Sequence, residues 1–458
     1  MQHRTPQSSP STVSAAAQQE YAQAFATFQT LLGRLDVGQL PPEHPATVYT
    51  TLVTTWLLVY QRLHAGCSLV KAVAELLQTP AVNLPDNRRV REGTLSANTA
   101  GYSRARKRLK PEVTEALADQ AYRLLIAATP PSLGTRRVLM LDGTTVTLAP
   151  TPALKAAFPP ATNQQGTSVW PVAHMLVVHE LSSGCALLPE LAPMYGDEGA
   201  SELELTKRIL PRIPADSVLL ADRNFGIFAV AHAAVQAGHN IVFRLKEDRF
   251  RALCRSATLI EEAGLIRRWR LNWTPSAKEH RAHPDLPSSA AVQVYLHEIR
   301  LSAELTLWLV TTLESGTSNL AELYKRRVDV ETDIRDVKVT LKIEELRAKS
   351  LPMLRKELAT SILAYNLVVQ VRRLAAQIAG VPPRRISFTG VLAALQVNLF
   401  QRPRDSADEQ WRGFMLALKF AAQRILPNRP GRSYPRSALK RQSKSTSGKP
   451  KRSIPKPM

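Results

Sequence analysis

The pattern of hydrophobic and polar positions changes near residue 136. Before it, between about 21 and 130, apolar residues recur at steps of three and four, as in AVAELL and EVTEALADQAYRLL, which predicts helices joined by proline-bearing loops. After it, RRVLMLDGTTVTLA, SVWPVAHMLVVHEL and CALLPEL have the length and composition of strands. The sequence therefore predicts a helical region followed by an antiparallel meander of three strands.

A regular alternation follows the meander. A helix at about 199–210, a buried strand at SVLLAD, a helix over FAVAHAAVQ that ends at Gly238 and a strand at NIVFRL come in that order. Three strands followed by helix, strand, helix and strand is the order of a ribonuclease-H-like α/β core. We expect this fold class for the centre of the chain.

Residues 247–318 interrupt that order. The short alternating stretches RRWRLNW, AVQVYLHEIRL and LTLWLVTTL predict a separate small β-sheet inserted into the core. A helical stretch at 319–350 returns to the core. ELATSILAYNLVVQVRRLAAQIAG then begins a C-terminal helical region that continues to about 426.

The charge balance indicates the kind of partner. The chain has 60 Lys and Arg against 38 Asp and Glu, a formal net charge of +22. Such an excess favours a polyanion, most commonly nucleic acid. A membrane surface is the alternative, but apolar stretches such as TLVTTWLLVY fall short of the roughly 20 residues that span a bilayer. We expect a cytoplasmic, nucleoid-associated protein with no membrane contact.

Basic residues are concentrated in two places. Residues 427–458 contain many Lys and Arg and no acid, which predicts a disordered tail. In the N-terminal helices, NTAGYSRARKRLK is either a solvated helix face or a DNA-contacting segment, and we expect DNA contacts from Arg104, Arg106, Lys107 and Arg108. The expected organisation is a disordered N-terminus (1–20), a helical DNA-binding region (21–130), the α/β core (131–246 plus 319–350), the β-rich insertion (247–318), a C-terminal helical region (351–426) and the tail (427–458).

Two aspartates follow hydrophobic strands. Asp142 comes after VLML and Asp222 after VLLA, each at or near the end of a predicted strand. A charge there is costly unless it is compensated. A turn or a helix cap would explain either aspartate alone, and Gly143 favours that alternative. A third carboxylate is needed to hold a pair of divalent metal ions.

The stretch YKRRVDVETDIRDVK offers candidates for the third carboxylate. On a continuous α-helix, at about 100° per residue, one stripe about 60° wide contains Tyr324, Arg327, Glu331 and Lys338. This stripe borders the predicted buried face, which consists of Leu323, Val330, Ile334, Val337 and Leu341.

The other acids of that stretch, Asp329, Asp333 and Asp336, fall away from both faces and are predicted to be solvated. Glu331 is therefore the acid that can reach the edge of the core where the two aspartates emerge. A simple helix-stabilising pair between Arg327 and Glu331 is the alternative.

With these residues in place, the chain resembles the DDE transposases of bacterial insertion sequences, in particular the family named after insertion sequence four. The hallmark of that family is Tyr, two residues, Arg, three residues, Glu, six residues and Lys, which Tyr324, Arg327, Glu331 and Lys338 match at every position. The resemblance extends through LDGTTV, LLADRNFG and AYNLVVQVRRLAA followed by ISF, and covers roughly residues 95–395.

The resemblance implies a transposase that binds the ends of an insertion sequence and performs cut-and-paste cleavage and strand transfer through a DNA hairpin. Asp142, Asp222 and Glu331 would be catalytic and would hold two Mg²⁺ ions, for which Mn²⁺ could substitute. The DNA partners would be the terminal inverted repeats and the target, held by a homodimer in the synaptic complex.

The resemblance also implies residues that contact DNA. Tyr324, Arg327 and Lys338 would grip phosphates, and Arg223 is a further candidate. Trp308 would support a base drawn out of the hairpin, with a buried strand aromatic as the alternative. Histidines 174, 179, 232 and 239 are expected to be structural, because a metal-assisted displacement needs no nucleophile from the protein.

Two other functions stay open at this point. A stand-alone Mg²⁺-dependent nuclease would cut DNA without joining it. A non-catalytic inhibitor of transposition would bind DNA without cutting it, although the three intact carboxylates argue against that alternative.

Overall fold

The computed structural model describes residues 43–79, 84–164, 166–314, 317–397 and 406–427, together with Gln19 and Ala22. The chain divides into two compact units, residues 1–425 and 426–458, and the helices and strands of the described residues belong to the first. The segments expected to be disordered, 1–20 and 427–458, lie outside the described residues apart from Gln19 and Pro427.

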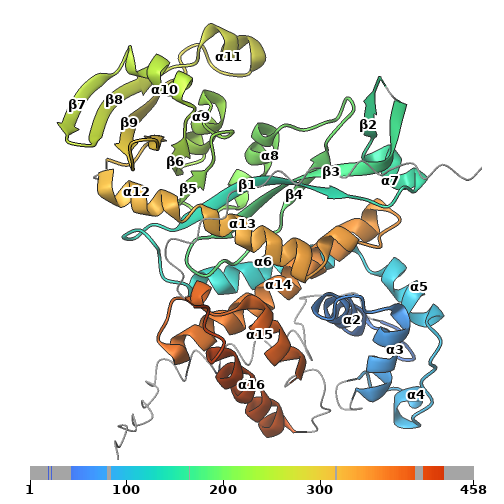
Figure 1. The fold of residues 1–458 in the computed structure, drawn as a ribbon. Helices are drawn as coiled ribbons and strands as arrows, with labels where there is room; N and C mark the ends of the chain where they lie inside the picture. Colours follow the sequence, from blue (N-terminus) through green and yellow to red (C-terminus); the bar gives the residue numbers. More distant parts are fainter. Residues whose placement is uncertain are drawn as a thin grey trace, which may run out of the picture. The chain divides into compact units, whose positions relative to one another are not determined.

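Ten strands of the described chain form one mixed sheet in the order β2-β3-β1-β5-β6-β10-β9-β8-β7, with β4 paired to β3 (Figure 1). The pairs β1–β5 and β5–β6 are parallel, and the other pairs are antiparallel. The strands are β1 (Val138–Thr147), β2 (Pro160–Asn163), β3 (Gly166–Glu180), β4 (Glu190–Pro193), β5 (Val218–Ala221), β6 (Asn240–Arg244), β7 (Thr258–Ala263), β8 (Ile266–Trp273), β9 (Val292–Arg300) and β10 (Thr306–Thr311).

The centre of the sheet follows from its apolar runs. All four residues of β5 are buried, as is typical of a parallel strand covered on both faces. The helices α8 (Glu202–Ile209) and α9 (Phe228–Gln236) lie where the alternation predicts them. β4 begins later than CALLPEL predicts, because Pro189 has no N–H to donate to a ladder.

The insertion is not a separate sheet, so that prediction was wrong. β10 pairs with β6, with Val310 opposite Phe243, and this pairing joins β7–β10 to the core as one continuous sheet. Leu309 and Val310 are fully buried on opposite faces of β10, as is typical of a strand inside a sheet. Without β10, β6 would expose an unpaired edge. Two short helices, α10 (Glu247–Cys254) and α11 (Ala277–Ala282), also belong to this region.

The remaining helices pack largely around α14, whose apolar residues cover most of its circumference (Figure 1). α14 contacts α2, α6, α15 and α16, so N-terminal and C-terminal helices share this one buried helix. In the described residues no helix is long and apolar enough to cross a membrane. The helices are α2 (Thr51–Leu63), α3 (Leu69–Gln78), α4 (Arg88–Arg91), α5 (Ala100–Arg108), α6 (Pro111–Ala128), α7 (Pro152–Ala157), α14 (Leu351–Ala379), α15 (Phe388–Leu395) and α16 (Ala407–Ala422).

The helix predicted to carry the four-residue stripe is interrupted twice. α12 (Thr317–Lys325) is followed by a turn and then by α13 (Val328–Arg335), which continues into the π-helical turn η3 (Asp336–Thr340). Periodicity over this stretch could not detect either interruption, because neither displaces the apolar positions from the core: Val330, Val337 and Leu341 are all buried.

Candidate active site

Asp142 and Asp222 come from neighbouring parallel strands. The β1–β5 ladder pairs Met140 with Leu220, and each aspartate lies two residues further along its own strand direction. Residues two apart on a strand point to the same face, and neighbouring strands lie roughly 4.8 Å apart. The structure therefore places the two sequence-predicted carboxylates side by side.

Asp142 lies within β1 rather than at its end. β1 continues to Thr147 because β3 pairs with it that far, whereas β5 ends at Ala221. Every residue of β1 up to Leu141 is buried, and burial decreases from Asp142 onwards. Asp142 thus occupies the point where β1 loses its parallel neighbour, which exposes part of the carboxylate without ending the strand.

Arg327 connects Asp142 to Glu331. Its Nη2 donates a hydrogen bond to Oε1 of Glu331 at 2.9 Å, and its Nη1 lies 3.6 Å from Oδ2 of Asp142. The side chains are 17%, 39% and 21% exposed for Arg327, Glu331 and Asp142 respectively. The predicted helix pair between Arg327 and Glu331 is present, but Arg327 also contacts Asp142 on β1.

Tyr324 and Lys338 flank this contact. Tyr324 is buried, which raises the pKa of its hydroxyl to about 12; Arg327 and Arg244 lower that pKa, and Asp222 and Asp142 raise it. Lys338 donates to Oγ1 of Thr144 at 3.2 Å and to the carbonyl oxygen of Thr145 at 3.0 Å.

Lys338 also pairs with Glu344 at 2.9 Å. Because Lys338 belongs to the π-helical turn η3, its position differs from the one that a continuous helix would give it.

The electrostatics of Asp142 reflect its burial first and the neighbouring charges second. Burial raises the pKa of its carboxyl to about 6; Arg327 lowers this pKa, and Asp222 and Glu331 raise it. Asp222 and Glu331 therefore both lie near enough to Asp142 to disfavour its charged form.

The donor chemistry of this group fits a hard divalent cation, because all three side chains present carboxylate oxygens. Among the residues that the structure describes, however, no three His, Cys, Asp or Glu side chains already stand close enough to hold a metal ion. The cation between Asp142 and Glu331 in this structure is the guanidinium of Arg327.

Glu202 is a further carboxylate at this place that sequence reasoning missed. It lies in the first turn of α8, and a Cβ atom on Gly143 would collide with its Oε1. Burial raises the pKa of Glu202, and Asp222 and Asp142 raise it further. The sequence signal was Ser201–Glu204, a capping box that fixes the start of α8 and hence the place of Glu202.

The three acids predicted to be solvated are not, so that prediction was wrong. Asp333 is fully buried, Asp336 is 4% exposed, and the side chain of Asp329 is 28% exposed. Asp329 and Asp333 both contact Arg384 of the C-terminal region. A helical wheel for one segment cannot reveal a second partner that comes from fifty residues further along the chain.

The predicted DNA-contacting cations of α5 divide into two groups. Arg104, Lys107 and Arg108 are exposed, and Arg108 also donates to the carbonyl oxygen of Tyr49 at 2.9 Å. Arg106 instead donates to Oε1 of the buried Glu357 at 2.8 Å. Its guanidinium therefore binds a buried carboxylate, so Arg106 does not lie with the exposed cations of α5.

The two remaining predicted DNA contacts lie near the sheet. Arg223 is exposed directly after Asp222. Trp308 is half-buried on β10, opposite Glu298 of β9, and packs partly against the core. Residues His174, His179 and His239 are buried, and a ring nitrogen of each lies within hydrogen-bond distance of a backbone carbonyl oxygen.

Comparisons with known proteins place this site in a family. The family model described as "Transposase DDE domain" matches residues 133–367, about half of the chain and the part that holds all three carboxylates. A search of the curated proteins found no match. One similar solved structure is the piggyBac transposase in a synaptic complex with hairpin DNA, with 10% identity over 91% of this chain and 87% of that chain and a TM-score of 0.37, too low to support an argument. On the strength of the family match, this chain belongs to the transposases with a DDE domain.

Proposed function

We propose that this transposase cuts and joins DNA with a metal-dependent site made of Asp142, Asp222 and Glu331. The observation that carries the proposal is the contact of Arg327 with both Glu331 and Asp142, since it joins α13 to the strand beside Asp222. This contact supports a shared site for Asp142 and Glu331, which are far apart in the sequence.

The finer classification is part of the same proposal. The strand order β4-β3-β1-β5-β6, antiparallel and then parallel, supports a ribonuclease-H-like core. The spacing of Tyr324, Arg327, Glu331 and Lys338 supports membership of the family named after insertion sequence four. The proposed functional division keeps the core at 131–246 plus 319–350 and DNA-end binding in the helices of 21–130.

Asp142, Asp222 and Glu331 would hold two Mg²⁺ ions, or Mn²⁺, and these ions when bound supply Lewis-acid stabilisation of the attacking and leaving oxygens of an in-line displacement. The chain itself supplies orientation. Arg327 presents a planar fork suited to two phosphate oxygens, and Lys338 presents a point charge held against β1. The buried phenol of Tyr324 donates rather than ionises at neutral pH, because its pKa is raised to about 12.

DNA contacts outside the centre complete the proposal. Arg104, Lys107 and Arg108 would bind phosphates of the element's ends, and Arg223 would bind a phosphate next to the cleaved bond. Trp308 would receive a base drawn out of a hairpin. Coupled cleavage of two ends requires two copies of the chain, so we propose a homodimer on DNA.

The test is incubation of the full chain and Mg²⁺ with a supercoiled plasmid that carries the element's two ends. We expect excised ends and joined products, and none of either from Asp142→Ala. Glu322→Gln is the matched control, because Glu322 is an exposed acid of α12 paired with Lys325 rather than with the site.

The same assay separates the other two functions. Nicked plasmid without joined products would indicate a nuclease that cuts only. DNA-end binding without any cleavage by the wild-type chain would indicate an inhibitor of transposition. Either result would overturn the proposed strand-transfer activity.

A further inference from the structure

α13 carries two ion-pair systems on different faces. Arg327 and Glu331 are four residues apart and face β1, and Asp329 and Asp333 are also four residues apart. Because the second pair is offset from the first by two residues, it lies about 200° further round the helix. One face therefore points to the proposed active site, and the other points into the C-terminal region.

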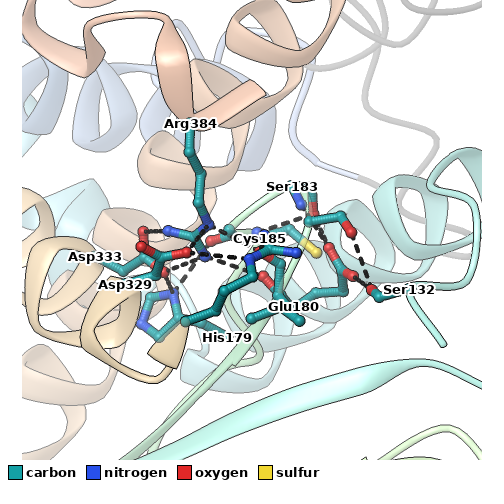
Figure 2. Close-up of polar contacts among 12 residues, drawn as sticks. Ser132, His179, Glu180, Ser183, Cys185, Asp329, Asp333 and Arg384 are labelled. Atoms are coloured by element: carbon teal, nitrogen blue, oxygen red, sulfur yellow. Dashed lines mark hydrogen bonds and ion pairs between the residues drawn. The ribbon is translucent and has the colours of Figure 1, made fainter. Parts of the chain in front are cut away.

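Arg384 binds both acids of the second face (Figure 2). Its Nη1 and Nη2 donate to the two oxygens of Asp333 at 2.7 and 2.8 Å, the forked geometry that an arginine and a carboxylate prefer. Its Nε lies 3.4 Å from Oδ2 of Asp329. Asp333 is fully buried, so the carboxylate of this ion pair is shielded from water.

The same guanidinium is fixed to the end of β3. Nε of Arg384 donates to the carbonyl oxygen of Leu181 at 2.8 Å, and Nη2 lies 3.3 Å from the carbonyl oxygen of Glu180. Gly184, with a φ of +82°, lets the turn after β3 approach: a Cβ there would stand 3.2 Å from Oδ1 of Asp333 and 3.5 Å from Nη2 of Arg384. Because β3 pairs with β1, with Val177 opposite Asp142, Arg384 ties α13 to the strand beside the first aspartate.

α13 depends on such a support, because it has only eight residues and no side chain caps its N-terminus. Its N-cap residue is Arg327, whose side chain can donate hydrogen bonds but cannot accept them from the amides of the first turn. Its other end continues into the π-helical turn η3. A helix this short gains most of its stability from tertiary contacts.

Resting on the proposed function, we propose that Arg384 is a positioning residue for Glu331. By binding Asp329 and Asp333 on one face of α13, it fixes the rotation of the helix about its axis and its position against the sheet. It thereby sets where Glu331 lies relative to Asp142 and Asp222. Arg384 touches neither DNA nor the carboxylates of the active site in this role.

The experiment compares four variants of the full chain: Arg384→Met, Arg384→Lys, Glu331→Gln and Arg212→Met. Arg212 is the matched control, because it also binds two carboxylates, Asp119 and Glu190, at 3.0 and 2.7 Å, on elements other than α13. The readouts are Mn²⁺ affinity by calorimetry, hydrogen exchange of the α13 amides without metal, and the melting temperature.

We expect Arg384→Met to weaken Mn²⁺ binding by about tenfold, the loss typical of removing an outer support of a metal ligand. The α13 amides should exchange faster in this variant without metal. Arg212→Met should lower the melting temperature but leave both other readouts at the wild-type values. If Arg384→Met does not fold, Arg384→Lys keeps the charge without the fork and should show the same changes.

Wild-type Mn²⁺ affinity and wild-type α13 exchange in a folded Arg384 variant would overturn the inference. Wild-type Mn²⁺ affinity in Glu331→Gln would instead overturn the proposed function. Hydrogen exchange of α13 would then still decide whether Arg384 holds the helix.

Discussion

The two faces of α13 both carry charged residues four positions apart, but they place them in different surroundings: Arg327 and Glu331 face β1, and Asp329 and Asp333 face Arg384. On the Arg384 face, two carboxylates share one arginine that also binds backbone carbonyl groups, and Asp333 is fully buried. On the Arg327 face, one arginine serves acids that remain 21% and 39% exposed, while Asp222 and Glu202 add negative charge nearby. Because Asp329 also lies 3.6 Å from Nε of Arg326, two arginines compensate the two acids of the first arrangement, whereas the acids of the second share one arginine at a more accessible place. The difference indicates that burial and compensation, rather than sequence spacing, separate a structural ion pair from a candidate catalytic one.

Glu331→Gln gives the largest expected effect, because it removes a charge from the accessible face and nothing from the buried one. We expect DNA cleavage to fall by on the order of 10³-fold, about 4 kcal/mol of transition-state stabilisation, with the melting temperature nearly unchanged. Single-turnover cleavage of an end-bearing plasmid measures it. A variant that cleaves at the wild-type rate would mean that Arg327 and Glu331 form only a helix-stabilising ion pair.

Asp333→Ala makes the opposite change, on the buried face. It leaves Arg384 without its forked partner, and breaking a buried pair from one side costs about 3–5 kcal/mol of unfolding free energy. Urea unfolding measures the loss. Glu322→Gln, which removes an exposed acid, should cost less than about 1 kcal/mol. Equal losses in the two variants would mean that the Arg384 face is not the buried one.

Asp336 allows a test of burial by pH. Burial raises the pKa of its carboxyl from 3.8 to about 6; Arg372 and Arg335 lower this pKa, and Asp333 raises it. The folded chain therefore binds this proton more tightly than the unfolded chain, and stability is lost as pH rises from about 4 through 6. Asp336→Asn removes that loss, so the variant should be more stable than the wild type at pH 8 by about 1–3 kcal/mol.

Melting curves of the two Asp336 chains across this pH range provide the measurement. The difference between the chains should shrink to the effect of the amide alone below pH 4. A difference that does not depend on pH would contradict the raised pKa.

Gly143→Ala should have the smallest effect. The added methyl group meets the end of the Glu202 side chain, which can move, so we expect a cost below about 1 kcal/mol. Adding Glu202→Ala should restore the lost stability, and this recovery, measured by a double-mutant cycle, confirms that the two residues are in contact. Additive effects would place Glu202 away from β1.

The strands of the core were predictable because each one is an uninterrupted apolar run or alternation. VLML and VLLA became β1 and β5, and their aspartates became neighbours. The pairing of β10 with β6 was not predictable, because the residue pattern of each strand is the same whether the strand lies at the edge of a sheet or inside it. Strand pairing across sixty residues leaves no local pattern.

In the candidate site, the contact of Arg327 with Glu331 was predictable from four-residue spacing, but the burial of Asp333 was not. That burial depends on Arg384, which lies in η5 (Pro383–Arg385), a short turn without helical periodicity. Glu202 was hidden for a similar reason, since only the approach of α8 to Gly143 brings it to the aspartates. Within this stretch the sequence thus predicted the pair that shares a helix and missed the partners that come from other elements.

The pairing of β10 with β6 limits how this chain can be shortened. A deletion of residues 247–313 would remove β10, the hydrogen-bonding partner of β6. Arg244, Phe243 and Val242 of β6 would then lie on an unpaired edge, which favours pairing between molecules. A smaller engineered enzyme must therefore retain β10, and shortening should begin at the edge strand β7 and proceed inward.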